Sequence, residues 1–297
     1  MHRQTVKNGH AMLSLRTYEA ASGISHTSVV IGGAMGVRQD FYADFAVWLS
    51  GQGFRVTTFD YRGMGESLPD TPGGSLRGFD ADLMDWASDY EAVINTAKTA
   101  LPDAPLYLLG HSLGAQLPGF LKNQHKVNGL VSIAAGSGYW RDNAPQLKRL
   151  ILYFWYVLVP LATRLCGYFP GRKLKKVGDL PAGVMLQWRK WCLNPQYSVG
   201  AEGESARLSY AQVRFPVQAL SMTDDELVTW RGTNNLINLY ANAPRSVQRI
   251  APGDLQVKRI GHFGFFRQQF EKSLWPRTRQ MFEAMAVAPV SVTSTTV

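Results

Sequence analysis

The chain has 297 residues, of which 45% are hydrophobic and 18% are charged, and its formal net charge is +9. This composition excludes a disordered or fibrous chain and is sufficient for one large domain, with room for an inserted subdomain. Because no nucleic-acid-binding motif accompanies the positive charge, we expect a basic surface and no nucleic-acid partner.

The first half of the chain alternates between short apolar runs and helical patterns. It opens with a predicted β-hairpin over 5–20, whose turn is Asn8–Gly9. Predicted strands then cover 27–32, 54–60, 104–110 and 128–136, with helices over 38–53, 80–100 and 113–124 between them. Continuous apolar strands separated by helices are typical of a parallel sheet covered on both faces.

The alternation stops at residue 137 and returns near 215. Residues 137–210 have a helical, aromatic-rich pattern without a convincing strand. Strands are then predicted over 215–222 and 254–260, with helices over 226–240 and 266–285, before a loose tail. The sequence thus predicts an α/β core formed by 1–136 and 211–297, with a helical cap or lid over 137–210.

The apolar stretch 150–169 raises the question of a membrane span. Pro160 and Arg164 interrupt it, and uninterrupted apolar character lasts only over 150–162. A spanning helix needs about 20 apolar residues. We therefore expect a helix above a binding site that can contact a membrane surface without crossing it.

Cysteine content and the N-terminal segment both favour the cytoplasm. The chain has two cysteines, Cys166 and Cys192, which are too few for a disulfide framework. It has no N-x-S/T sequon, and MHRQTVKNGHAMLSL lacks an apolar core of signal-peptide length.

A G-x-S-x-G pattern, GHSLG at 110–114, is the first candidate for chemistry. It follows an apolar strand and precedes a predicted helix, which is the setting of a serine held at a sharp strand-to-helix turn. Ser112 is therefore the candidate nucleophile. The alternative is a packing turn between two glycines.

A serine hydroxyl needs a base, and His262 is the best placed of the six histidines. It lies in GHFGFF, directly after the predicted strand 254–260. Because the carboxyl ends of parallel strands gather at one edge, His262 can meet Ser112 despite their separation in sequence. The alternative is a capping or packing histidine.

The base in turn needs an acid, and Asp224 and Asp225 follow the strand 215–222. The order serine, aspartate, histidine is that of α/β-hydrolases. We favour Asp225 because of its D-x-x-V spacing to Val228. The other aspartate would then be the N-cap of the helix over 226–240.

A tetrahedral oxyanion needs two preorganised donors. We expect the N–H of Leu113 to be one of them. The loop IGGAMG should supply the other, from Ala34 or, as second choice, Met35.

Taken together, these motifs resemble the α/β-hydrolase superfamily over roughly 25–285. Besides GHSLG and GHFGFF, FDYRGMGES at 59–67 resembles the D-x-R-G-x-G-x-S loop of many such enzymes. The loop IGGAMG departs from the common His-Gly form and is similar to a bacterial branch grouped with esterases, lipases and serine aminopeptidase-like proteins. The resemblance implies a mostly parallel central sheet with helices on both faces and a helical lid over the nucleophile.

From the lid position we expect the aromatic residues of 137–210 to form an apolar roof over the substrate. The predicted substrate-binding residues are Tyr139, Trp140, Trp155 and Trp188. The alternative is that these rings pack the lid onto the core.

We therefore expect a serine hydrolase that cleaves carboxylic esters with a hydrophobic acyl or alcohol group, without cofactor or metal. H-E-x-x-H, finger-type cysteine pairs and a phosphate-binding loop are all absent from the sequence. A thioesterase or an amidase or peptidase would use the same triad, and Glu202 and Glu204 could hold a substrate amine. A non-catalytic membrane-surface or binding protein is the alternative from another class. The oligomeric state stays open.

Overall fold

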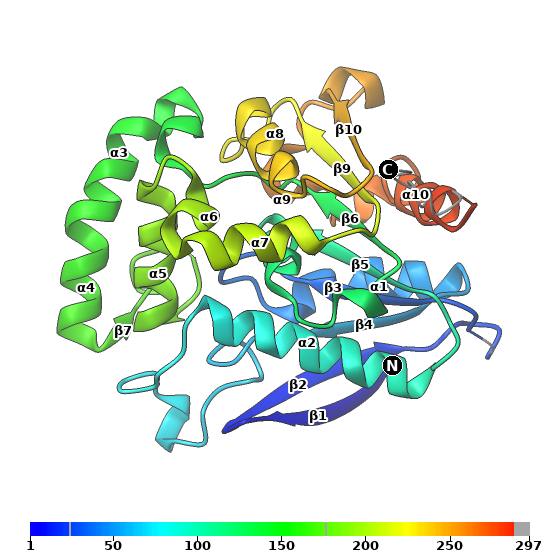
Figure 1. The fold of residues 1–297 in the computed structure, drawn as a ribbon, viewed down its shortest axis with the longest axis horizontal. Coiled ribbons are helices and arrows are strands. Elements are labelled where there is room, and N and C mark those ends of the chain that lie inside the picture. The colour runs from blue at the N-terminus through cyan, green and yellow to red at the C-terminus, as the bar shows by residue number, and fades with distance from the viewer. Residues whose placement is uncertain (24, 176, 288–297) are drawn as a thin grey trace, which may run out of the picture.

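The computed structural model describes residues 1–23, 25–175 and 177–287 (Figure 1). Its centre is an eight-stranded sheet of order β1-β2-β4-β3-β5-β6-β9-β10. The strands are β1 His2–Asn8, β2 Ala11–Tyr18, β3 Ser28–Gly32, β4 Arg55–Phe59, β5 Leu106–His111, β6 Gly129–Ile133, β9 Val217–Met222 and β10 Arg245–Ile250. From β4 to β10 neighbouring strands are parallel, whereas β1 and β2 are antiparallel. The predicted α/β class is confirmed.

Helices cover both faces of this sheet. The helices outside the segment between β6 and β9 are α1 Ala43–Gly51, α2 Leu83–Ala100, α8 Trp230–Leu239, α9 Gly261–Gly264 and α10 Trp275–Val287. Alternate strand residues point to opposite faces. Val30 and Leu108 share one core with Trp86 of α2, whereas Ile31 and Leu109 share the other with α1 and α10.

The predicted N-terminal hairpin is confirmed, but its predicted turn at Asn8–Gly9 is wrong by one residue. Asn8 pairs with Ala11, which leaves Gly9 and His10 as the turn residues. Gly9 has a φ of 61°, a conformation that glycine adopts without a steric penalty.

The predicted helix over 113–124 is replaced by three 3₁₀ turns, Ser112–Ala115, Leu117–Phe120 and Gln124–Lys126. Pro118 has no N–H to donate, and the backbone of Leu121 is extended. The chain therefore leaves the serine turn without forming a regular helix.

The predicted strand 254–260 is wrong, because the last strand of the sheet is β10 at Arg245–Ile250. β10 lies at the sheet edge, and most of its side chains are exposed, so its sequence has no continuous apolar run. Residues 252–255 instead form a 3₁₀ turn that leads towards α9.

The segment between β6 and β9 consists mainly of α3 Lys148–Tyr153, α4 Val159–Cys166, α5 Ala182–Leu193, α6 Tyr197–Glu202 and α7 Glu204–Gln212. A π-helical turn, Phe154–Leu158, joins α3 to α4, and the combined helix forms the outer margin of the molecule (Figure 1). The sequence missed two short paired strands here, β7 Tyr168–Phe169 and β8 Leu180–Pro181. We call residues 137–210 the cap segment, and its division from the core stays a prediction.

Within the described residues, no helix has both the length and the apolar character needed to cross a bilayer. The tail predicted to be loose lies outside the described residues beyond Val287.

Candidate active site

Ser112 lies at a sharp turn between β5 and the 3₁₀ turn that follows it. Its φ of 52° falls in the left-handed region, which non-glycine residues seldom occupy. A Cβ at Gly110 would overlap the backbone of Gly114 and Ala115, and a Cβ at Gly114 would overlap the carbonyl of Gly32. The two motif glycines are therefore required by close backbone contacts, as a nucleophile turn demands.

His262 and Asp225 form a buried pair. The Nδ1 atom of His262 lies 2.8 Å from Oδ2 of Asp225. The other carboxylate oxygen accepts the N–H groups of Leu227 and Val228, each at 2.8 Å. Because an ionised carboxylate only accepts, Nδ1 carries the proton, and Nε2 of a neutral ring is free to act as a base.

The two acidic neighbours of Asp225 hold the backbone of the histidine loop. Oδ2 of Asp224 accepts the N–H groups of Ile260 at 2.8 Å and Gly261 at 3.1 Å. Oε2 of Glu226 accepts the N–H of His262 at 3.0 Å. Asp224 is therefore not the N-cap of α8; that residue is Thr229, whose hydroxyl accepts the N–H of Gly232.

Glu226 is also paired with Arg259 at 2.9 Å. Burial alone would raise the pKa of Glu226, but hydrogen bonds from backbone N–H groups and the Arg259 guanidinium lower that pKa below its usual value. The carboxylate is therefore ionised at neutral pH and is a strong acceptor for the His262 N–H.

His111 connects the serine turn to the histidine loop. Its ring is fully buried, and its centroid lies 5.2 Å from that of His262. Nε2 of His111 lies 3.1 Å from the carbonyl oxygen of His262, and Nδ1 lies 2.9 Å from the hydroxyl of Tyr42. Burial, and secondly the neighbouring His262, lower the pKa of His111 well below its usual value, so the ring is neutral. The sequence carried no signal for Tyr42.

Ser112 directly follows His111, whose ring contacts His262, although the described residues contain no hydrogen bond between the serine hydroxyl and the His262 ring. Hydrogen bonds between a nucleophile and its base often tighten only in the substrate complex. The geometry brings the three predicted catalytic residues to one edge of the sheet.

The two candidate residues of the oxyanion loop differ in what their N–H groups contact. The N–H of Ala34 donates to the Tyr42 hydroxyl at 2.8 Å. In the described part of the chain, the N–H groups of Met35 and Leu113 have no hydrogen-bond acceptor. Of the predicted donors, Met35 and Leu113 therefore have N–H groups that remain available to an acceptor.

The D-x-R-G-x-G-x-S loop is bound to the segment that follows the IGGAMG loop. The Asp60 carboxylate accepts the N–H of Gln39 at 2.7 Å and the N–H of Glu66 at 2.9 Å. A Cβ at Gly65 would overlap the Asp60 carboxylate. This loop therefore has a structural task, which is to tie the chain after β4 to the chain after β3.

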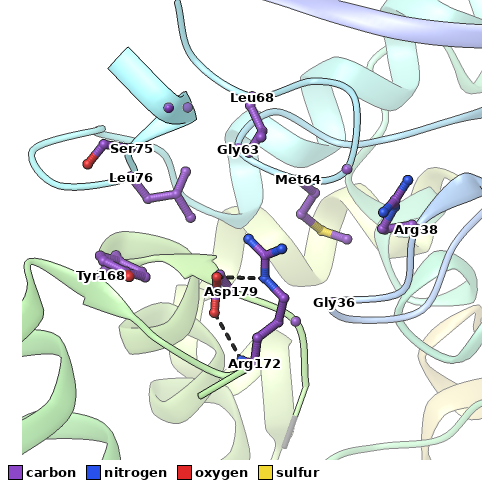
Figure 2. A pocket seen from close by; sticks show the side chains of 14 residues that line it. Gly36, Arg38, Gly63, Met64, Leu68, Ser75, Leu76, Tyr168, Arg172 and Asp179 are labelled. Atoms are coloured by element: carbon purple, nitrogen blue, oxygen red, sulfur yellow. Dashed lines mark hydrogen bonds and ion pairs between the residues drawn. The ribbon is translucent and has the colours of Figure 1, made fainter. Parts of the chain in front are cut away.

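A cavity of about 330 Å³ lies beside the oxyanion loop, between Gly36 and Arg38 on one side and the cap segment on the other (Figure 2). Arg172 and Asp179 form an ion pair at its cap wall, 2.7 Å apart. None of Ser112, Asp225 and His262 lines this cavity, so we do not assign the reacting group to it.

The predicted substrate-binding aromatics have different surroundings. Trp155 is 1% exposed, and its ring packs edge-to-face against that of Trp188 at 5.1 Å. Trp155 thus belongs to the core of the cap segment and has no surface to offer a substrate in this conformation. Trp140 packs against the main core, and Tyr139 lines a second hollow of about 410 Å³ together with Arg231.

The sheet, the serine turn and the buried histidine–aspartate pair define an α/β-hydrolase. Residues 25–252 match a family model described as "Serine aminopeptidase, S33". The chain belongs to this family.

Relatives and solved structures agree with this class. Over 99 residues the chain is 37% identical to lysophosphatidylserine lipase ABHD12 of Macaca fascicularis, a match that covers 33% of this chain and 22% of that protein. The chain thus spans less than a quarter of that relative's length. A soluble variant of monoglyceride lipase from Saccharomyces cerevisiae has a TM-score of 0.67, with 14% identity over 95% of this chain and 94% of that one. Est1E from Butyrivibrio proteoclasticus, with ferulic acid bound, has a TM-score of 0.64, with 12% identity over 96% and 100%.

Proposed function

We propose that this α/β-hydrolase cleaves carboxylic esters that carry a hydrophobic acyl or alcohol group. The observation that carries the proposal is the strained Ser112 at the end of β5, together with a His262 ring held at Nδ1 by Asp225. Lipase and esterase relatives support an ester as the substrate class.

In the proposed reaction, Nε2 of His262 takes the proton of the Ser112 hydroxyl as the serine oxygen attacks the acyl carbon. The N–H groups of Leu113 and Met35 stabilise the oxyanion. His262 then gives its proton to the leaving alcohol, and an acyl-enzyme remains. Water, deprotonated by the same ring, attacks this acyl group, and the collapse of the second intermediate releases the acid and free Ser112.

The cap segment offers little support for an aminopeptidase reaction. Glu202, a candidate for holding a substrate amine, accepts hydrogen bonds from Trp191 and Gln187 and pairs with Lys190. Glu204 pairs with Arg207. Both carboxylates already have partners inside the cap segment, which favours an ester or thioester over a peptide with a free amino terminus.

The test combines a fluorophosphonate probe with p-nitrophenyl esters and CoA thioesters of graded chain length. Wild type should be labelled at Ser112 and should hydrolyse the esters. Ser112→Ala should lose labelling and at least about 1,000-fold in kcat/KM. A wild-type protein that takes no label contradicts the proposed nucleophile, and faster turnover of thioesters than of matched esters would make the enzyme a thioesterase.

We also propose that the outer face of the cap segment rests on an anionic membrane surface. Five exposed apolar side chains recur at a spacing of three or four residues along the helix formed by α3, the π-helical turn and α4: Leu150, Tyr153, Val157, Leu161 and Leu165. Trp155, Val159 and Thr163 are buried on its opposite side. The helix is amphipathic in the sense of an interfacial helix, with its apolar stripe turned outwards.

Charge favours a lipid surface as the occupant of this stripe. Between Asp142 and Asp179 the sequence has no acidic residue and seven basic ones, Lys148, Arg149, Arg164, Arg172, Lys173, Lys175 and Lys176. Arg164 lies in the helix itself, and exposed Lys173 and Lys175 follow it. An apolar stripe accompanied by basic groups suits anionic headgroups above acyl chains.

The membrane proposal is tested by flotation with phosphatidylglycerol and phosphatidylcholine vesicles. Wild type should bind the anionic vesicles more tightly, and salt should weaken this binding. The variant L150S/L161S/L165S, whose leucines are 54% to 68% exposed, should bind at least about tenfold more weakly. The matched control M12S/V47S/L68S, whose side chains are 38% to 58% exposed outside the cap segment, should bind like wild type. Equal binding by both triple variants, or no binding by wild type, contradicts the proposal.

The cytoplasmic location is likewise a proposal, supported by Cys166 and Cys192, which are both free thiols.

A further inference from the structure

We propose that Tyr42 and His111 are positioning residues that couple the oxyanion loop to the catalytic base, an inference that rests on the proposed esterase reaction. Three hydrogen bonds form the link, which we call the Tyr42–His111 chain. They run from the Ala34 N–H to the Tyr42 hydroxyl at 2.8 Å, from that hydroxyl to His111 at 2.9 Å, and from His111 to the His262 carbonyl at 3.1 Å.

The direction of every proton in this chain is determined. The carbonyl oxygen of His262 can only accept, so Nε2 of His111 must carry a proton. A neutral ring then accepts at Nδ1, and the Tyr42 hydroxyl must donate to it. The lone pairs of that hydroxyl remain for the Ala34 N–H. Because both side chains are buried, water has little access to these groups.

The Tyr42–His111 chain connects the oxyanion loop to the catalytic base, two parts of the site whose relative positions must stay fixed. At one end it fixes the peptide of Ala34, directly before the Met35 N–H that we assign to the oxyanion. At the other end it holds the carbonyl of His262, whose N–H is bound by Glu226 and whose ring is bound by Asp225. His262 is thereby held at its ring, its N–H and its carbonyl, and the contact at the carbonyl leads through His111 and Tyr42 to the oxyanion loop.

Aromatic rings close off the surroundings of the chain. Phe266 and Phe263 lie with their ring centroids 4.9 Å and 5.6 Å from that of His111, and Phe41 stacks on it at 6.3 Å. In such an apolar setting each hydrogen bond is strong, and a missing partner is costly because no solvent replaces it. Loss of the Tyr42 hydroxyl should therefore move both ends of the Tyr42–His111 chain, the peptide of Ala34 and the carbonyl of His262.

The first test is Tyr42→Phe, with Tyr61→Phe as its matched control. Tyr61 is also fully buried, but in the described residues its hydroxyl has no hydrogen-bond partner. We expect Tyr42→Phe to lower kcat and the rate of Ser112 labelling by a fluorophosphonate about tenfold or more, with KM within about twofold of wild type. Tyr61→Phe should stay within about twofold in all three quantities. A merely structural role for Tyr42 would not separate kcat from KM in this way.

The second test is a double-mutant cycle with His111→Leu, which removes the same chain at its centre. Either change breaks the Tyr42–His111 chain of hydrogen bonds. The fold-decrease in kcat of the double variant Y42F/H111L should therefore equal that of the more damaging single variant, and not the product of the two single decreases.

Three outcomes are distinguishable. A labelled wild type with equal kcat in Tyr42→Phe and Tyr61→Phe overturns the positioning role alone, and so do losses that multiply in the double variant. A wild type that takes no label overturns the proposed function and this inference together. If H111L does not fold, the comparison of Tyr42→Phe with Tyr61→Phe still decides.

Discussion

Two parts of the candidate site, which we call the acid–base flank and the oxyanion flank, are built from different groups. On the acid–base flank, three consecutive carboxylates, Asp224, Asp225 and Glu226, each bind a different part of residues 260–262. On the oxyanion flank the hydrogen bonds that run from Ala34 to His262 pass through neutral groups, the Tyr42 hydroxyl and the His111 ring, and the Asp60 carboxylate lies behind them, where it accepts the N–H of Gln39. Both flanks end on His262, which is held from each side.

The difference indicates separate tasks. Ionised acceptors are suited to the side where His262 becomes positively charged, because their charge stabilises an imidazolium. Neutral, buried donors and acceptors are suited to direct contact with the side where the oxyanion forms, since a negative charge in that contact would oppose it. The acid–base flank should therefore govern the chemistry most strongly, and the oxyanion flank should show its effect in geometry and in pH dependence.

The largest effect is expected on the acid–base flank, where Asp225 and Asp224 should differ sharply. Asp225→Asn removes the carboxylate that keeps the proton on Nδ1 of His262, so kcat should fall by about 1,000-fold or more. Asp224→Asn keeps an oxygen that can accept from Ile260 and Gly261, and kcat should fall about tenfold at most. Steady-state kinetics on one p-nitrophenyl ester measures both.

Urea unfolding of the two variants is the control, because it separates loss of catalysis from loss of fold. If the two variants lose activity equally, Asp225 has no special relation to the ring, and the assignment of the triad acid is wrong.

Much of the fold could be predicted because its signals are local. Apolar runs such as LYLLG mark strands buried on both faces, and Asp82 and Asp85 mark the start of α2 through a reciprocal capping box. β10 escaped prediction because an edge strand exposes most of its side chains and its pattern is polar. The helix after Ser112 was predicted from its apolar residues, but Pro118 breaks it into 3₁₀ turns.

In the site, sequence order selected Ser112, Asp225 and His262, but the surrounding contacts depend on tertiary structure. Tyr42 meets His111 only because the helical segment after β3 packs beside the end of β5, a relation that no local pattern carries. The same hydroxyl binds the N–H of Ala34, which is why Met35 replaces Ala34 as the second donor in the proposed mechanism.

For the cap segment, composition correctly indicated a helical, aromatic region, but could not determine which way each side chain faces. Trp155 points into the segment, whereas Leu161, six residues later, is exposed on its outer side. Both are apolar, and only packing against α5 and its neighbours distinguishes them.

The smallest effect is expected on the oxyanion flank, from the titration of His111. Its pKa is lowered in the folded protein by burial and by the adjacent His262, whereas the pKa of a histidine in the unfolded chain is about 6.5. Below that pH the unfolded state binds a proton that folded His111 does not. The free energy of unfolding should therefore be fully retained above about pH 6.5 and should fall as the pH drops below it, by up to about 1.4 kcal/mol per pH unit.

Among the described residues, the groups that face His111 include the Tyr42 hydroxyl, the ring and carbonyl of His262 and three phenylalanine rings, and all of them remain in a His111→Gln variant. Urea unfolding at pH 7.5 and pH 5.5 should show a smaller loss of stability for His111→Gln than for wild type, by about 1 kcal/mol. His125→Gln, which changes an exposed histidine, should match wild type. If wild type and His111→Gln lose the same stability between the two pH values, His111 accepts a proton in the folded protein. The neutral tautomer on which the Tyr42–His111 chain depends is then wrong.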